Sequence, residues 1–401
     1  MKYIVILADG MADNPIPEWD DKTPLMVARK PVMDHLCSLG RTGRLQSVPE
    51  GMHPGSEIAN MNILGFDPEK YFPGRGVLEA AALNIPLRAN ELVFRCNLVT
   101  LEEGRLMNHS AGHISHEEAG ELISVLNDEL ITEGVRFHQG VSYRNLMMLR
   151  DGDPEITCLP PHDHPGSALD ELWPTSKGKS AAQTAEKLKE LIQKSYKILN
   201  QHPVNKARKE KGLPPANAIW PWSPGKGKDF PAFKDRWGIR SGAVISAVDL
   251  IRGIGSMAGL DNIYVEGATG LYDTNYEGKA AAAVNALKKY DFVFLHVEAA
   301  DEAGHEGDKD LKKRVVEDFD HRLLEPLYEG IRNLDESVAI ALLPDHPTPC
   351  AIRTHTSDPV PFFVIKPGVE PDDVSVFDEF SVSRGAMGNL KDGEVLQYLF
   401  S

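Results

Sequence analysis

The stretch from Val338 to Ile365 constrains the fold more than any other part of the sequence. It begins with the apolar run Val338–Leu343, which predicts a buried strand, and it ends in a second apolar run. Between the two runs lie the adjacent Asp345 and His346 and, further along, His355. In α/β proteins the loops at the carboxyl ends of strands gather ligands and catalytic groups. We therefore expect these three polar side chains to converge just beyond the end of a strand.

Two further apolar runs are followed by the same residue types. The run over residues 3–8 leads directly into Asp9, and the run over residues 291–297 is followed by Asp301 and His305. The i, i+4 spacing of Asp301 and His305 places both side chains on one face of a helical turn, where such a pair is often only solvated. Together the segments supply three aspartates and three histidines, which suit two Mn²⁺ or Zn²⁺ ions in mixed carboxylate–imidazole shells.

Ser56 immediately precedes an apolar segment with helical periodicity. It is therefore expected near a helix N-terminus, where backbone N–H groups and the helix dipole favour an anion. A plain N-cap role is the alternative interpretation of a serine at this position. Coordination to a metal ion activates a serine hydroxyl as a nucleophile without a neighbouring base. The pattern thus predicts phosphoryl transfer through Ser56 if the metal ligands converge on it.

Composition excludes several classes of function. The formal net charge of −16 argues against a nucleic-acid-binding surface. No apolar run approaches the roughly 20 residues that a membrane helix needs. The four cysteines are scattered without a CxxC motif, and the N-terminal Met-Lys leads straight into a short strand rather than a secretory signal. We expect a cytoplasmic enzyme that acts on a small phosphorylated metabolite.

The candidate metal ligands divide the chain into domains. Asp9 and Ser56 precede a middle region of different texture, and the other ligands follow it, within an alternation of strands and helices typical of α/β proteins. We therefore predict a discontinuous catalytic domain over residues 1–86 and 256–401, interrupted by an inserted domain over residues 87–255. Within the insertion the sequence predicts a capping box at Ser115 and loop-like connections over residues 150–180 and 202–238.

Motifs along the whole chain resemble the archaeal-type cofactor-independent phosphoglycerate mutases of the alkaline phosphatase superfamily. The matching stretches are LADGMAD at 7–13, PGSEIANMNILGFDP at 54–68, GRGVLEAAA at 74–82, HPVN at 202–205, GLPPAN at 212–217, GATGLYDTN at 267–275 and DEAGHEGD at 301–308. The resemblance implies an alkaline-phosphatase-like sandwich, in which helices flank a central, mostly parallel sheet and an α+β domain is inserted. It also implies interconversion of 3-phosphoglycerate and 2-phosphoglycerate without 2,3-bisphosphoglycerate.

The same resemblance assigns roles to individual residues. It implies that Ser56 is transiently phosphorylated and that the inserted domain holds the glycerate while it reorients. Two divalent cations are implied, Mn²⁺ in the first place and Zn²⁺ or Mg²⁺ as alternatives. One cation would be held by Asp9, Ser56, Asp345 and His346, and the other by Asp301, His305 and His355.

The chain departs from the family pattern where contacts to the acceptor are expected. His109 and His113, in NHSAGHIS, stand where an Asp-Arg…Gly-Arg-Ile pattern would place arginines. An arginine fork grips a carboxylate with two parallel hydrogen bonds, which an imidazole cannot do. Together with IWPW at 219–222, these histidines resemble a bacterial branch proposed to phosphorylate homoserine in threonine synthesis. Homoserine phosphorylation, phosphomonoester hydrolysis and a non-catalytic metal-binding role therefore remain alternatives.

Several cationic or polar side chains are candidates for substrate contacts. Arg75 lies between two glycines, where it could bind an anion or fix a hinge, and Asp163 is either a substrate contact or an exposed loop charge. Lys279 could stabilise phosphoryl charge near Ser56 or be a solvated lysine at a helix start. The full set of candidates is Arg75, His109, His113, Arg144, Asp163, Arg240 and Lys279.

Overall fold

The computed structural model describes residues 1–401, and the chain forms two compact units. Unit 1 consists of Met1–Phe72, Ala81–Asn84 and Asp229–Ser401, and unit 2 consists of Pro73–Ala80 and Ile85–Lys228. Each unit has its own hydrophobic core. Helix α5 (Arg75–Ala82) begins in unit 2 and ends in unit 1.

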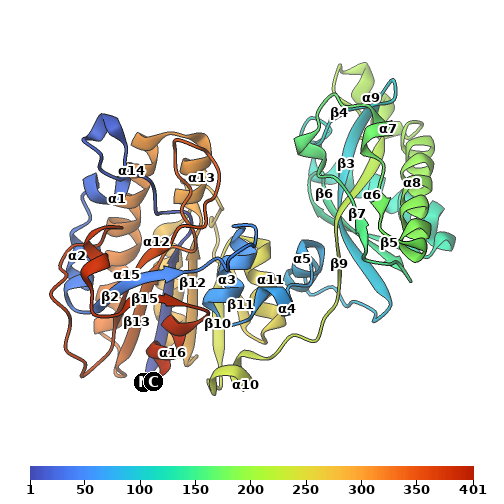
Figure 1. The fold of residues 1–401 in the computed structure, drawn as a ribbon. Coiled ribbons are helices and arrows are strands. Elements are labelled where there is room, and N and C mark those ends of the chain that lie inside the picture. The colour runs from blue at the N-terminus through green and yellow to red at the C-terminus, as the bar shows by residue number, and fades with distance from the viewer. The chain divides into compact units, whose positions relative to one another are not determined.

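Unit 1 is built on an eight-stranded sheet (Figure 1). Its first five strands are parallel, whereas β14 is antiparallel to both of its neighbours. The central strands β12 and β13 are buried along their whole length, which explains their unbroken apolar runs. The strand order is β11 (Asp261–Ile263), β10 (Gly242–Ile245), β12 (Phe292–Val297), β1 (Lys2–Ala8), β13 (Val338–Leu343), β14 (Val360–Ile365), β2 (Arg41–Gln46) and β15 (Gly388–Lys391).

Helices pack on this sheet and bury the apolar side chains of its strands. Helix α12 packs on the central strands and α2 on β2 and β14, whereas α11 packs on β10 and β11 and α16 on β13 and β15. The expected α/β class with a mostly parallel central sheet is thus confirmed. The helices of unit 1 are α1 (Pro24–Val27), α2 (Pro31–Ser38), α3 (Ser56–Ile63), α4 (Pro68–Tyr71), α10 (Phe233–Trp237), α11 (Asp249–Met257), α12 (Tyr276–Leu287), α13 (Ala299–Glu306), α14 (Lys309–Asp318), α15 (Glu325–Arg332) and α16 (Glu394–Phe400).

A π-helical segment, Phe319–Leu324, joins α14 to α15. It carries the buried Asp320, whose carboxylate accepts hydrogen bonds from the backbone N–H groups of Val32 and Met33 at the start of α2. Such wider turns inside helices often serve to place one side chain. Here the turn supplies partners for donors that every helix N-terminus leaves unpaired.

Unit 2 is built on a five-stranded antiparallel sheet. The predicted capping box is present, because Ser115 and Glu118 exchange hydrogen bonds at the start of α6. The strands are β3 (Glu91–Glu102), β4 (Arg105–Asn108), β5 (Val135–Val141), β6 (Arg144–Arg150) and β9 (Ala218–Lys226), with a separate pair β7 (Ile156–Thr157) and β8 (Thr175–Ser176). The helices are α6 (His116–Leu130), α7 (Leu169–Leu172), α8 (Lys179–Leu199) and α9 (Pro203–Glu210). No helix of either unit is both long and apolar enough to cross a membrane.

Two predictions about the insertion need correction. The region 202–238 was predicted to be loop-like, but it contains β9, which pairs with β3 despite two prolines that disguise the strand in the sequence. The predicted boundary at residue 255 falls inside α11. Because β10 pairs with β12 in the large sheet, residues 229–255 belong to unit 1.

Glu379 makes the stability of unit 1 depend on pH. Burial raises its pKa to about 7, although the Thr23 hydroxyl and the Asp13 N–H group donate to the carboxylate. Because the folded-state pKa lies above the unfolded value, stability falls as the pH rises from about 4.5 to about 7. We expect Glu379→Gln to gain stability over the wild type, by about 2 kcal/mol, at pH 8 but not at pH 4.5. Thermal unfolding of both proteins at the two pH values measures this difference, and an equal gain at both would contradict it.

Candidate metal centre

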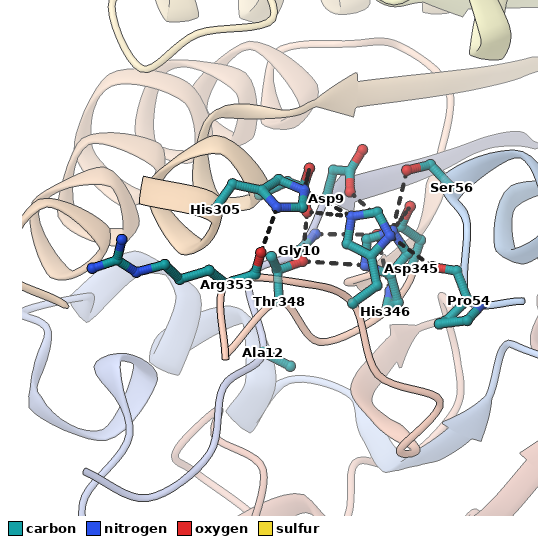
Figure 2. A network of polar contacts seen from close by, with 12 residues as sticks. Asp9, Gly10, Ala12, Pro54, Ser56, His305, Asp345, His346, Thr348 and Arg353 are labelled. Atoms are coloured by element: carbon teal, nitrogen blue, oxygen red, sulfur yellow. Dashed lines mark hydrogen bonds and ion pairs between the residues drawn. The ribbon is translucent and has the colours of Figure 1, made fainter. Parts of the chain in front are cut away.

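The seven predicted metal-site residues meet at the carboxyl ends of neighbouring parallel strands of unit 1 (Figure 2). Asp9 follows β1, and α13, which carries Asp301 and His305, follows β12. The loop after β13 supplies Asp345, His346 and His355, and Ser56 opens α3. The short connections from these strands bring distant parts of the sequence to one edge of the sheet, as α/β topology requires.

One half of the site consists of Asp301, His305 and His355. The Nε2 atoms of His305 and His355 each lie 3.2 Å from an oxygen of Asp301 and only 2.9 Å from one another. Their Nδ1 atoms contact backbone carbonyl oxygens, at 3.0 Å from Arg353 and 2.7 Å from Pro54. A carbonyl only accepts, so both Nδ1 atoms carry hydrogen, and in neutral rings the two Nε2 lone pairs face one point. That arrangement fits a cation between them.

In this half, Asp301 and His305 stabilise each other's charged forms. Burial opposes ionisation of Asp301, but the hydrogen bonds from His305 and His355 hold its pKa well below the ordinary value. Asp301 in turn raises the pKa of His305 to about 9. A proton can therefore occupy the place of a cation when no metal is bound. Metal binding must displace that proton.

The other half consists of Asp9, Asp345, His346 and Ser56. The Nε2 atom of His346 lies 3.1 Å from Ser56 Oγ, 3.6 Å from Asp9 Oδ1 and 3.5 Å from Asp345 Oδ2. Asp9 Oδ1 is buried and has no hydrogen-bond partner. An unpaired carboxylate oxygen in the interior is costly unless a cation meets it, so this half also fits a metal ion.

The two halves adjoin. The rings of His346 and His355 are stacked with centroids 4.0 Å apart. Ligand atoms of Asp301, His346 and His355 lie within 4.8 Å of one another, and so do those of Asp9, Asp345 and His346. Burial, followed by the charges of Asp345 and Asp301, raises the pKa of Asp9 well above its ordinary value. The donor set of carboxylates, imidazoles and one hydroxyl suits two divalent cations.

Ser56 is the first residue of α3, whereas Gly55 occupies the N-cap position. The plain N-cap interpretation of Ser56 is therefore wrong, and its hydroxyl points to His346 instead (Figure 2). Asn60 lies one turn further along α3. Its amide donates to the Ser56 carbonyl and to Asp345 Oδ2, both at 2.8 Å, and so ties the helix to the loop after β13.

Gly10 allows β1 to end against α13. Its φ angle of +64° lies in the left-handed region, and a Cβ atom there would lie 2.5 Å from Asp301 Cα. Its N–H group donates to Asp345 Oδ1 at 3.1 Å. Only glycine tolerates both the positive φ angle and the close approach to Asp301, so the Asp-Gly pair after β1 joins the two halves of the site.

Comparisons with known proteins agree with this site. A family model described as 2,3-bisphosphoglycerate-independent phosphoglycerate mutase matches residues 37–205. The protein of that name from Methanosarcina acetivorans is 48% identical over 401 residues, which cover 100% of this chain and 99% of the relative. This chain belongs to the archaeal-type 2,3-bisphosphoglycerate-independent phosphoglycerate mutases.

The fold of this mutase is similar to that of two solved structures. A protein from Pyrococcus horikoshii superposes with a TM-score of 0.82 at 30% identity, over 99% of this chain and 96% of that one. The cofactor-independent phosphoglycerate mutase from Thermoplasma acidophilum has a TM-score of 0.70 at 28% identity, over 100% and 99% of the two chains. The family resemblance expected from the sequence motifs is confirmed.

Five of the substrate-contact candidates of the mutase lie in unit 2. The ring of Tyr143 contacts those of His109 and His113, with centroids 5.8 and 5.9 Å apart, and the Arg144 guanidinium lies 5.6 Å from the Tyr143 ring. His162, which sequence reasoning missed, lies against His109 and pairs with Asp163. Burial, followed by the neighbouring imidazoles, lowers the pKa of His109.

The two remaining candidates lie in unit 1. Arg240 precedes β10, and its side chain, 92% exposed, faces Asp291 at the amino-terminal end of β12. It thus lies at the amino-terminal ends of the strands, whereas the metal ligands lie at the carboxyl ends. Arg240 is therefore excluded from a site at the carboxyl ends. Lys279 is buried in α12 and donates to the His296 carbonyl at 3.1 Å, not to Ser56.

Lys312 of α14 is a buried support that the sequence did not reveal, because lysine on an amphipathic helix is normally solvated. Its Nζ atom donates to the carbonyls of Ala12 and Thr348 and to the Asp13 carboxylate, at 2.8–3.0 Å. It therefore ties the loop after β1 to the loop after β13. Thr348, also missed, contacts both Asp301 and His346.

We expect Lys312→Met to destabilise the mutase by about 3–5 kcal/mol, because it leaves the Asp13 carboxylate buried without its cation. Lys313 provides a matched control, since it is part-exposed and pairs with Glu317 at 2.8 Å on the helix surface. Lys313→Met should cost less than about 1 kcal/mol. Denaturant unfolding of both variants measures the difference, and equal losses would show that the buried contacts of Lys312 are unimportant.

Proposed function

We propose that this mutase interconverts 3-phosphoglycerate and 2-phosphoglycerate by carrying the phosphoryl group on Ser56. The observation that supports this most directly is the position of the Ser56 hydroxyl, 3.1 Å from His346 Nε2 and beside the unpaired Asp9 Oδ1. A hydroxyl among buried carboxylates and imidazoles has little structural purpose. It is well placed to react.

The cations would be held by the two halves of the site, Asp9, Ser56, Asp345 and His346 for one and Asp301, His305 and His355 for the other. Divalent cations there lower the pKa of a coordinated hydroxyl and neutralise phosphoryl charge. Mn²⁺ is the first choice for this mixed oxygen and nitrogen donor set.

The protein's own groups orient the serine. Thr348 Oγ1 donates to Asp301 and lies 3.3 Å from His346 Nδ1, from which it can accept. The His346 Nε2 lone pair then faces Ser56 Oγ. Ser56 also opens α3, where the positive end of the helix favours the added negative charge of a phosphoserine.

The transfer consists of two displacements that balance each other. Ser56 Oγ bonds to phosphorus as the bond from phosphorus to one glycerate oxygen breaks. The glycerate reorients, its other hydroxyl attacks, and the bond between Oγ and phosphorus breaks. Ser56 returns to its starting state, so no external phosphoryl donor is consumed.

The cluster in unit 2 formed by Arg75, His109, His113, Arg144, His162 and Asp163 is proposed to bind the glycerate. Burial lowers the pKa of His162, the neighbouring Asp163 raises it, and the positive charges of Arg95 and Arg75 lower it again. His113 is held at a φ angle of +53°, directly after Gly112 at +63°. Strained backbone at a non-glycine residue is typical of binding sites.

Homoserine phosphorylation remains the second candidate because His109 and His113 replace expected arginines. Homoserine carries an ammonium group that glycerate lacks, and Asp163 is an acidic group within the cluster that could receive it. Purified protein is assayed with 3-phosphoglycerate alone and with homoserine plus phosphoryl donors. Formation of 2-phosphoglycerate supports the proposal, whereas O-phosphohomoserine alone would replace it, and release of inorganic phosphate alone would indicate a phosphatase.

Ser56→Ala should lower mutase turnover by at least about 10³-fold, because the group that carries the phosphoryl is lost. The variant should keep the thermal stability of the wild type. Mass spectrometry of the acid-quenched wild type should find a phosphoryl group on the peptide that contains Ser56. Turnover of the variant at the wild-type rate would exclude the serine mechanism.

Arg144→Leu should raise the KM for 3-phosphoglycerate about 10- to 100-fold, because it removes a charged partner of the substrate anion. Arg150 provides the control, since both arginines are exposed at opposite ends of β6. Arg150→Leu should leave the kinetics unchanged. Steady-state assays of both variants measure this, and unchanged KM in Arg144→Leu would remove Arg144 from the substrate contacts.

A further inference from the structure

A buried row of polar side chains crosses the carboxyl edge of the large sheet. Ser246, His296 and Asp9 come from the three neighbouring strands β10, β12 and β1 or from the residue just after them. The strand registers pair Ile245 with Leu295 and Leu7 with His296, so Ser246 lies level with His296, and Asp9 lies two residues beyond Leu7 in the direction of the chain. They are 5%, 0% and 0% exposed, respectively.

The hydrogen bonds along this row have one consistent direction. His296 Nε2 lies 2.9 Å from Asp9 Oδ2, and His296 Nδ1 lies 3.1 Å from Ser246 Oγ, which accepts from the Val248 N–H group at 3.0 Å. The ionised Asp9 that a cation requires can only accept, so Nε2 carries the hydrogen. Nδ1 of a neutral ring then accepts from the Ser246 hydroxyl. Each donor has one acceptor, and the backbone N–H group fixes the end of the row.

The row leaves Asp9 with one free oxygen. Oδ2 is occupied by His296, whereas Oδ1 has no hydrogen-bond partner and lies 3.6 Å from His346 Nε2. A half-turn of the carboxylate would only exchange two equivalent oxygens, but any smaller turn about its last bond would move Oδ2 away from His296. Such a turn would break the bond to His296 in a place that water does not reach, where an unpaired polar group is costly.

We propose that His296, oriented by Ser246, is a positioning residue that keeps Asp9 Oδ1 directed into the metal centre. The inference rests on the proposed function, because it assumes that Asp9 binds a cation. It reverses the common arrangement in which a carboxylate orients a histidine ligand. His296 lies inside the buried apolar strand β12, and both of its ring nitrogens have polar partners there.

The test compares Mn²⁺ affinity at one fixed pH, by calorimetry and by electron paramagnetic resonance, in the full chain. His296→Leu removes the donor to Asp9, and binding should weaken about 10- to 100-fold. His296→Gln retains an amide N–H near the Nε2 position and should restore most of the affinity. Wild-type affinity in folded His296→Leu, or no rescue by His296→Gln, would overturn the proposal.

Ser246→Ala keeps the test decisive if His296→Leu does not fold. It removes one hydroxyl and should weaken Mn²⁺ binding a few-fold, with loss of the Nε2-protonated tautomer of His296 in ¹⁵N NMR spectra. Ser47→Ala is the control, because Ser47 is equally buried and its Oγ has no partner. Affinity of Ser246→Ala equal to that of the control overturns the inference. Absence of Mn²⁺ binding in the wild type would instead overturn the proposed function.

Discussion

Three buried carboxylates lie together at the carboxyl ends of the strands, and the structure has to offset their mutual repulsion. Asp9, Asp301 and Asp345 are at most 4% exposed, and the charges of Asp345 and Asp301 help to raise the pKa of Asp9. Like charges in a dry interior repel strongly. Imidazoles, backbone N–H groups and the Asn60 amide offset part of this repulsion, and two cations would offset the rest. Asp9 Oδ1 is the carboxylate oxygen of this group for which the protein provides no hydrogen-bond partner.

The rest of unit 1 can be understood as a rigid frame for those charges. Parallel strands bring the loops together, and separate ties keep each loop in place. Gly10 lets β1 approach α13, and Lys312 joins the loops after β1 and β13. The row from Ser246 to Asp9 adds a third tie across the sheet. Ligands that are held in position before the metal arrives lose little conformational freedom on binding it.

The cluster proposed to bind the glycerate in unit 2 has a different composition. It combines aromatic rings, imidazoles and arginines, whereas the family pattern favours arginines at the positions of His109 and His113. Imidazoles supply hydrogen bonds that depend on protonation, and arginines supply permanent charge. Arg144 beside Tyr143, with Arg75 near His162, retains cationic groups where the expected ones are missing. The chain can therefore belong to the family and still carry His109 and His113 in place of the expected arginines.

The sequence by itself determined the α/β class, the family and the seven residues, Ser56 among them, that meet at the carboxyl ends of the strands, because strand-end motifs are local and their residue types are chemically specific. Only the tertiary structure decided what surrounds them. Arg240 and Lys279 looked suitable as charges, but strand direction and burial assign them elsewhere. His296, Thr348 and Lys312 gave no local signal, since each acts through a partner far away in sequence. The end of the insertion was also decided by tertiary structure, because the pairing of β10 with β12 assigns residues 229–255 to unit 1.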